Sequence, residues 1–253
     1  MKIKGIIFDF GFTLFEFIDV SMDKYFNCFR KGLNKSIEKL KESNLIDDLD
    51  TIKEFIKTFN NKRASYFRKS VRTKQEFPTS YIFQDILEDE KFNIKIGNQE
   101  FYQDLANVFH SFEEDEWVPF ENTRETLEKL SEFENLKMAV LSNHPNHATI
   151  INLLKKHNLL KYFDAIVTSA EFGKRKPHPD IFYHTIEKMG LEIPETDSCI
   201  ICGDEHADIV GGHKAGLQTI LCERVYKFPF EKEIEHHNYI IIKDISEILN
   251  YIT

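Results

Sequence analysis

The stretch Lys4–Phe15, KGIIFDFGFTLF, decides how the rest of the chain is interpreted. The apolar run Gly5–Phe8 predicts a buried strand, and Asp9 interrupts it. A carboxylate within a buried strand is costly unless its charge is paired, so we expect the strand to end at Asp9. Gly11 then permits a sharp turn, and Thr13 adds a hydroxyl group. The stretch therefore predicts that Asp9 faces a ligand at a strand end, or else caps the following turn as an ordinary aspartate.

Composition narrows the class of protein and its partners. The 253 residues are 42% hydrophobic and include 23 Phe, enough for a sizeable core, which argues against disorder. A net charge of −9 argues against nucleic acid as a partner, so an anionic substrate would need local positive groups. Four Cys and no export signal favour a reducing compartment, and no run approaches the roughly 20 apolar residues of a membrane span. We expect a cytoplasmic protein without a membrane partner, present as a monomer or homodimer.

The hydrophobic period divides the chain into two kinds of segment. Between residues 17 and 116 apolar residues recur three or four apart, which predicts an all-helical module without a strand. Before and after it, short apolar runs alternate with amphipathic helices, which is typical of a parallel sheet covered on both faces. We therefore predict an α/β domain, residues 1–16 and 117–253, that carries the helical module 17–116 as an insertion. Besides Gly5–Phe8, the predicted strands are 136–142, 165–168, 199–202, 219–221 and 239–242.

Four further features have ordinary structural interpretations. Basic residues between positions 63 and 74 are expected to form the solvated face of a predicted helix. The acidic run 113–116 is expected to be a linker. Cys199 and Cys202 lie three apart in a strand, so their thiols point to opposite faces and cannot readily meet. We expect His144 to cap a helix or face solvent. The basic cluster consists of Arg63, Arg68, Lys69, Arg72 and Lys74.

Polar residues stand at the predicted strand ends, where open parallel sheets hold ligands. Asp9 ends the first strand, and Ser142 with Asn143 ends the run LKMAVLS. Asp204 follows the run CIICG, and Asp208 lies four residues further on. Taken singly, each has an ordinary role as a helix cap or a first-turn charge. Their shared position at strand ends favours one common site.

Lys176 completes this set of residues. It precedes Pro177 at a predicted helix start, which holds it in a defined direction. Carboxylates, a hydroxyl and a lysine at one edge suit a hard cation and a phosphate, and oxygen ligands favour Mg²⁺. Ser142 and the amides after it would bind phosphate oxygens, and Lys176 would neutralise the phosphate and the nucleophile.

Four short segments resemble the motifs of haloacid dehalogenase-like hydrolases with a helical cap inserted after the first motif. DFGFTL (9–14) resembles the first motif, Asp-x-Asp-Gly-Thr, and LSN (141–143) the second. KP (176–177) resembles the third, and GDEHAD (203–208) followed by GGHKAG (211–216) the fourth. The resemblance spans the whole chain. It implies a Rossmann-like core, Mg²⁺, and hydrolysis of a small phosphorylated metabolite through an aspartyl-phosphate.

The resemblance also implies a role for each matching residue. Asp9 would be the nucleophile and a metal ligand. Asp204, Asp208 and the backbone carbonyl of Gly11 would complete the metal site. The phosphoryl group would be held by Thr13, Ser142, Asn143 and Lys176.

Two positions depart from the family pattern. Gly11 stands where the family has a second Asp that acts as general acid and base, and Phe12 stands where a glycine is usual. Without a general acid, we expect a preference for leaving groups that need little protonation, such as acyl or aryl phosphates. His144, His206 and Glu16 are candidates to supply the proton instead. Two alternatives follow: phosphonoacetaldehyde hydrolase-like C–P cleavage through a cap lysine, or a catalytically weak metal- and phosphate-binding regulatory protein.

Overall fold

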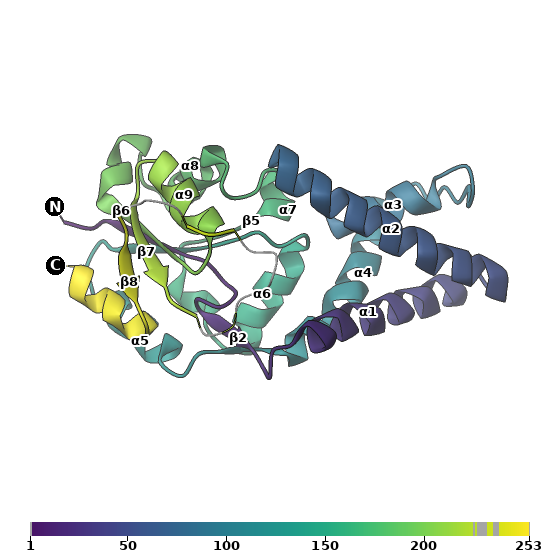
Figure 1. Ribbon diagram of the computed structural model, residues 1–253, viewed down its shortest axis with the longest axis horizontal. Helices are drawn as coiled ribbons and strands as arrows, with labels where there is room; N and C mark the ends of the chain where they lie inside the picture. The colour runs from purple at the N-terminus through teal and green to yellow at the C-terminus, as the bar shows by residue number, and fades with distance from the viewer. Residues whose placement is uncertain (1, 225, 227–231, 235–237, 253) are drawn as a thin grey trace.

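The computed structural model describes residues 2–224, 226, 232–234 and 238–252. Its larger part is a six-stranded parallel sheet in the order β5-β4-β1-β6-β7-β8 (Figure 1). β1 is in the middle, and Phe8 pairs with Val140 on one side and Cys202 on the other. The strands are β1 Gly5–Phe8, β4 Lys137–Ser142, β5 Ala165–Thr168, β6 Cys199–Gly203, β7 Gln218–Cys222 and β8 Ile240–Ile242. The predicted α/β class and parallel sheet are confirmed.

Helices cover both faces of this sheet because alternate residues of each buried strand point to opposite sides. Ile6 and Phe8 lie in the apolar cluster that also holds residues of α5 and α6, whereas Ile7 lies in the cluster of α8. Cys202 and Cys199 are divided between the same two clusters, so their predicted separation is confirmed. The helices of this domain are α5 Thr123–Ser131, α6 His147–Lys156, α7 Ser169–Phe172, α8 Pro179–Lys188 and α9 His206–Lys214. Three separate 3₁₀ helices are η2 Leu160–Tyr162, η3 Ile193–Ser198 and η4 Ile245–Tyr251.

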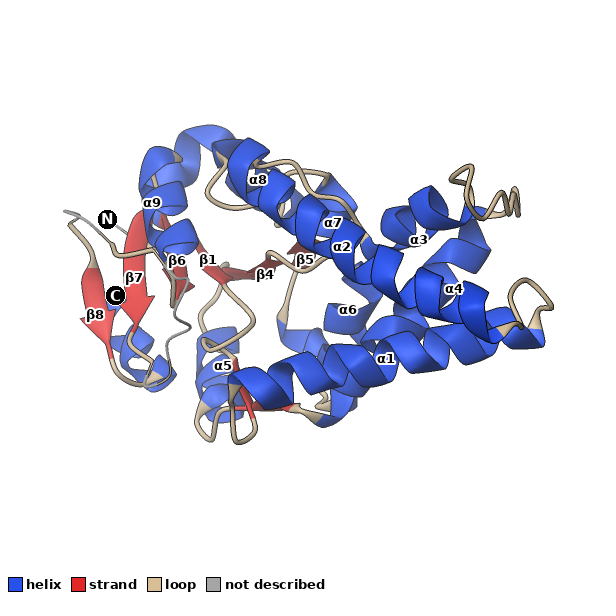
Figure 2. Cartoon of the chain, turned by 45° about the vertical axis from the view of Figure 1, so that its right-hand side comes forward, coloured by secondary structure: helices blue, strands red, loops and turns tan. Residues whose placement is uncertain are grey.

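The inserted module is a separate helical layer with its own aromatic-rich core (Figure 2). The first two of its helices begin where capping side chains accept backbone hydrogen bonds: Ser21 accepts from Lys24, and Asp48 accepts from Thr51 at 2.8 Å. Phe55, Phe59 and Phe83 are fully buried in its core. Its elements are α1 Met22–Glu42, α2 Leu49–Thr73, α3 Thr79–Leu87, α4 Gln99–His110 and the 3₁₀ helix η1 Ser111–Asp115. We refer to these helices as the cap.

A short antiparallel ribbon joins the two connections between the sheet and the cap. Strand β2 Phe15–Phe17 pairs with β3 Trp117–Pro119, with Phe17 opposite Trp117. The expectation of no strand between 17 and 116 is therefore wrong at its first residue, because a three-residue strand carries too weak a period to be read. We propose that this ribbon marks the boundary between the core, 1–16 and 117–253, and the cap, 17–116.

The predicted acidic linker is also wrong at Glu113. This residue lies in η1 and is only 4% exposed. A buried carboxylate needs partners, which are described with the site below. Among the described residues, no helix has both the length and the apolar character that crossing a bilayer requires.

Candidate active site

Three carboxylates converge at the carboxyl end of the central strands. Asp9 follows β1, Asp204 follows β6, and Asp208 lies in the first turn of α9. One oxygen atom from each lies within 4.8 Å of the others, and all three side chains are buried. Gly203 permits this approach, because a Cβ there would lie 2.3 Å from Cγ of Asp208. Adjacent parallel strands thus bring residues almost 200 positions apart to one edge of the sheet.

The ammonium group of Lys176 lies between two of these carboxylates. Its Nζ is 2.5 Å from Oδ1 of Asp9 and 2.6 Å from Oδ1 of Asp208, and it donates to the carbonyl of Leu141 at 2.9 Å. Its three N–H groups therefore have three acceptors, and the side chain is fully buried. Asn143 holds the backbone of Lys176 by accepting from its N–H at 2.8 Å and donating to its carbonyl at 3.1 Å. In this structure Asn143 thus orients the lysine.

Thr13 and Ser142 lie at the same edge. The Thr13 hydroxyl is fully buried and donates to Oδ1 of Asp204 at 3.4 Å. Ser142 is the last residue of β4, which pairs with β1, and is also buried. The structure therefore brings together the side chains that the sequence predicted for this site, although their chemical roles stay a proposal.

Arg224 is a site residue that the sequence analysis missed. Its Nη1 is 2.6 Å from Oδ2 of Asp204, and its guanidinium lies over the ring of Phe12 at 4.8 Å. Arg224 follows β7, the next strand in the sheet, at the same edge as Asp204. The strand-end rule that selected the carboxylates would have found it had basic residues been included.

Burial and mutual repulsion shift the protonation of this cluster. Burial, and next the charge of Asp9, raise the pKa of Asp204 well above its ordinary value. Burial raises the pKa of Asp208 to about 7, although Lys176 opposes the shift. Burial disfavours the charge of Lys176, but the carboxylates of Asp208 and Asp9 outweigh it and raise its pKa. The site therefore holds its carboxylates out of water and close together, which disfavours their full ionisation.

The sequence of this chain matches a known protein family. The sequence model described as "Haloacid dehalogenase-like hydrolase" matches residues 42–222, which is most of the chain. The chain belongs to the haloacid dehalogenase-like hydrolase family. The matched segment contains Ser142, Lys176, Asp204 and Asp208, whereas Asp9 precedes it.

Curated relatives of this hydrolase are named as phosphatases. The chain is 24% identical to pyrophosphatase PpaX of Oceanobacillus iheyensis over 254 residues, covering 100% of this chain and 98% of the relative. It is 33% identical to phosphoglycolate phosphatase of Aquifex aeolicus over 133 residues, 50% of this chain and 59% of the relative. This protein is therefore a hydrolase of the phosphatase-containing family.

Solved structures share the fold at low sequence identity. A 2-haloacid dehalogenase from Pseudomonas syringae pv. Tomato has a TM-score of 0.66 at 17% identity, covering 98% of this chain and 97% of that one. A predicted phosphoglycolate phosphatase from Haemophilus somnus has a TM-score of 0.58 at 18% identity, covering 100% and 99%. These structures show that the Rossmann-like core with its helical insertion is the fold of haloacid dehalogenase-like hydrolases.

The two departures from the family's first motif have a structural explanation. A Cβ at Gly11 would lie 3.0 Å from Cη2 of Trp117, so the indole occupies the space beside this position. Phe12 adopts φ 58°, a left-handed conformation that favours glycine, and its ring packs edge-on against Trp117 at 5.2 Å. Trp117 therefore fills the direction in which a second Asp of the first motif would leave the backbone.

The residues present fit a hard divalent cation. The candidate ligands Asp9, Asp204 and Asp208 offer carboxylate oxygens only, which suits Mg²⁺ better than a metal that prefers sulfur or imidazole. Burial, together with the charge of Asp9, raises the pKa values of Asp204 and Asp208, so full ionisation of these carboxylates is costly. A bound cation would lower that cost by attracting the carboxylates.

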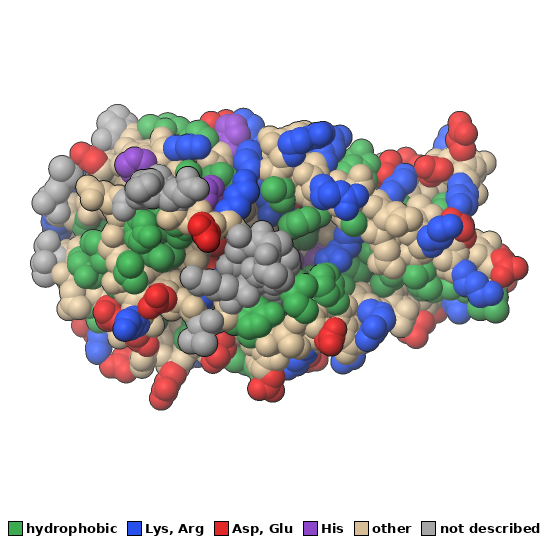
Figure 3. Space-filling model, viewed as in Figure 1, with side chains coloured by type: hydrophobic (Ala, Val, Ile, Leu, Met, Phe, Trp, Pro, Cys, Tyr) green, Lys and Arg blue, Asp and Glu red, His purple; other side chains and the backbone are tan. Residues whose placement is uncertain are grey.

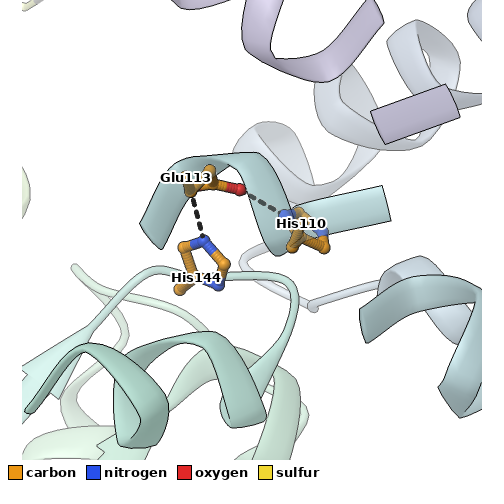
Figure 4. Close-up of side chains that lie close together, drawn as sticks. All are labelled: His110, Glu113 and His144. Carbon is orange, nitrogen blue, oxygen red and sulfur yellow. Dashed lines mark hydrogen bonds and ion pairs between the residues drawn. The ribbon is translucent and has the colours of Figure 1, made fainter. Parts of the chain in front are cut away.

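A second buried cluster joins the cap to the loop that follows β4 (Figure 4). Glu113 contacts Nδ1 of His110 through one oxygen and Nε2 of His144 through the other, at 3.2 Å for the latter. Burial lowers the pKa of His110 to about 4; burial also disfavours charge on His144, but Glu113 outweighs it and raises that pKa. The expectation that His144 caps a helix or faces solvent is therefore wrong, because it forms an ion pair with Glu113.

The outer nitrogens of both rings are also bonded. His110 Nε2 lies 2.8 Å from the Thr79 hydroxyl, and His144 Nδ1 lies 2.8 Å from the Asn146 carbonyl. If the two imidazoles of His110 and His144 together carry one positive charge, all four of their ring nitrogens and the Glu113 carboxylate have hydrogen-bond partners. The cluster is thus complete without a metal, and it connects the cap to a loop that also carries Asn143.

Proposed function

We propose that this hydrolase releases phosphate from a small phosphorylated metabolite, with Mg²⁺ and with Asp9 as the nucleophile. The observation that carries the proposal is the buried group of Asp9, Asp204 and Asp208 with Lys176 bonded to two of them. Relatives named pyrophosphatase and phosphoglycolate phosphatase support a small phosphorylated substrate. The four described cysteines are free and buried, which supports a reducing, cytoplasmic setting.

In the proposed reaction, a carboxylate oxygen of Asp9 attacks phosphorus and forms an aspartyl-phosphate. The bond from phosphorus to the leaving oxygen breaks, and that oxygen carries away the electron pair. Water then attacks the acyl-phosphate, which releases inorganic phosphate and restores Asp9. Lys176 fixes the carboxylate through Oδ1 and, with Thr13 and Ser142, stabilises charge on the phosphoryl oxygens.

The proposed cation site consists of three carboxylates and one backbone oxygen. Asp9, Asp204, Asp208 and the carbonyl of Gly11 would hold Mg²⁺. When bound, the cation supplies positive charge that shields a phosphate from these carboxylates. Arg224 then retains a role as counter-charge to Asp204.

Phosphate release from phenyl phosphate tests the proposal. We expect release in the presence of Mg²⁺, loss of release when EDTA removes the metal, and recovery when Mg²⁺ is added in excess. Loss on chelation is expected because three carboxylates would otherwise repel the phosphate. Equal rates with Mg²⁺ and with EDTA would contradict the metal site. Release no faster than in buffer would favour the regulatory binding protein.

The packing of Trp117 on Gly11 carries a second part of the proposal, a preference for good leaving groups. Without a general acid at Gly11, an alkoxide must leave unprotonated, whereas a phenoxide leaves readily. We expect kcat/KM for phenyl phosphate to exceed that for propyl phosphate by about 10²-fold or more. Comparable values for the two esters would show that another residue donates the proton.

The C–P cleavage alternative needs a cap lysine that can form a Schiff base. Burial, followed by the charges of Lys232 and Arg175, lowers the pKa of Lys74, which is the observation that favours it. However, the Lys74 ammonium donates to the carbonyl of Val71 within its own helix. Borohydride reduction in the presence of phosphonoacetaldehyde separates the two functions, because only a Schiff base would be trapped on the protein.

A further inference from the structure

The guanidinium group of Arg63 is a half-buried charge in the cap, and no described residue is its counter-ion. It lies over the ring of Phe29 at 4.0 Å and 5.6 Å from the ring centre of Phe109, where α1, α2 and α4 meet. In the described part of the chain, no carboxylate forms an ion pair with Arg63 and no acceptor receives its hydrogen bonds. Burial lowers the pKa of Arg63. A cation taken partly out of water without a partner is costly, which favours a role in binding an anion.

Glu113 is the carboxylate whose charge acts on Arg63, but its oxygens contact other residues. The charge of Glu113 favours the charged form of Arg63, but both Glu113 oxygens contact the imidazoles of His110 and His144 (Figure 4). Other basic residues of α2 behave differently. Arg68 is exposed, and Lys62 forms ion pairs with Asp85 and Asp89. Figure 3 shows exposed Lys and Arg side chains on the outer surface over α2.

A chain of aromatic contacts among buried and half-buried rings, which we call the aromatic wall, leads from Arg63 to the proposed nucleophile loop. The Tyr25 ring packs on Phe29 at 5.0 Å and on Phe17 at 5.7 Å. Phe17 in turn packs on Trp117 at 5.2 Å, and Trp117 contacts the backbone at Gly11, two residues from Asp9. Arg63 therefore lies at the cap end of a wall whose other end is the proposed nucleophile loop.

Charged groups of both the cap and the site act on Tyr25, a ring in the middle of this wall. Burial raises the pKa of Tyr25 to about 12, and the carboxylates of Glu113 and Glu205 add to this, while Arg63 opposes it. The Tyr25 hydroxyl is thus within electrostatic reach of both Arg63 in the cap and Glu205, the residue after Asp204. Tyr25, the half-buried ring of this wall, therefore lies between Arg63 and the proposed nucleophile loop.

We propose that Arg63 binds a second oxyanion of the substrate, so that this hydrolase prefers phosphate esters or anhydrides that carry a further carboxylate or phosphate. This inference rests on the proposed function, because it places the reacting phosphate at Asp9. Arg63 is a specificity-determining residue here. A charge-assisted hydrogen bond of this kind changes affinity or kcat/KM roughly ten- to hundredfold.

Matched aryl phosphates test this role. We expect wild-type kcat/KM for 3-carboxyphenyl phosphate or 1,3-phenylene bisphosphate to exceed that for phenyl phosphate by roughly ten- to hundredfold. Arg63→Met should remove this preference and leave kcat for phenyl phosphate nearly unchanged, and Arg63→Lys should restore part of it. Arg68→Met, an exposed arginine on the same helix, is the matched control and should keep the full preference. The carboxylate and bisphosphate arms show which oxyanion is bound more tightly.

Retention of the full preference in Arg63→Met would overturn the inference, as would a wild type that does not distinguish the three esters. If wild type releases no phosphate from any of them, the proposed function fails. The inference is then decided by binding calorimetry. Tighter binding of 3-carboxyphenyl phosphate than of phenyl phosphate, abolished by Arg63→Met, would still support it. Equal binding of both esters by wild type would overturn it.

Discussion

Asp9→Asn is expected to lower Mg²⁺-dependent phosphate release from phenyl phosphate by roughly 10⁴–10⁶-fold, because an amide oxygen is a poor nucleophile and forms no acyl-phosphate. The fold should be preserved, since Lys176 keeps its bonds to Asp208 and Leu141. Removing the negative charge of Asp9 also relieves repulsion at Asp204. The metal-free variant should therefore unfold at a temperature no lower than that of the wild type.

Asp23→Asn is the matched control for this substitution. Asp23 is an exposed carboxylate in the first turn of α1, and its amide variant should keep wild-type activity. Steady-state rates and thermal unfolding of the three proteins form one experiment. An Asp9→Asn protein that keeps more than about a hundredth of the wild-type rate would exclude Asp9 as the nucleophile.

Lys176→Met is expected to destabilise the metal-free protein by about 3–5 kcal/mol and to reduce activity severely, because it leaves buried carboxylates without their shared cation. Burial already raises the pKa of Asp208 to about 7 against the attraction of Lys176. Without the ammonium this pKa rises further, so the folded variant binds a proton that the unfolded chain releases. Its free energy of unfolding should therefore fall as the pH rises through neutrality.

Lys174→Met separates this effect from the general loss of a lysine. Lys174 is 44% exposed and pairs with Asp180 at the surface, so its replacement should change stability by less than about 1 kcal/mol. Chemical denaturation in EDTA measures both variants. Added Mg²⁺ should recover part of the stability of Lys176→Met by returning positive charge to the cluster. A Lys176→Met protein as stable as Lys174→Met at every pH would show that the ion pairs contribute little.

Residues at strand ends were predictable from the sequence because the carboxyl ends of parallel strands lie at the same edge of the sheet. Asp9 and Asp204 were assigned to one edge from the hydrophobic runs before them, and β1 and β6 are indeed neighbours. Lys176 was predicted from its position before Pro177. The α/β class and the helical insertion followed from the same change of period along the chain.

Other features depend on contacts between segments that have no shared pattern. The helical period of α2 gives the face on which Arg63 lies, but not that Phe29 of α1 covers it. Glu113 looks like one charge in an acidic run, and only its approach to His144 makes it a buried partner. Likewise, Gly11 appears as a missing acid in the sequence, whereas the structure shows Trp117 against it. Distances across the cap interface, and not local propensity, determine these three.

The β2–β3 ribbon has a mechanical consequence for the catalytic loop. Both covalent crossings between the two layers are bound into one ladder, with Phe17 opposite Trp117. The indole of that same Trp117 rests against Gly11. A rotation of the cap about this ladder would therefore move the indole against the backbone beside Asp9. We expect cap motion and the orientation of the Asp9 carboxylate to be coupled for this reason.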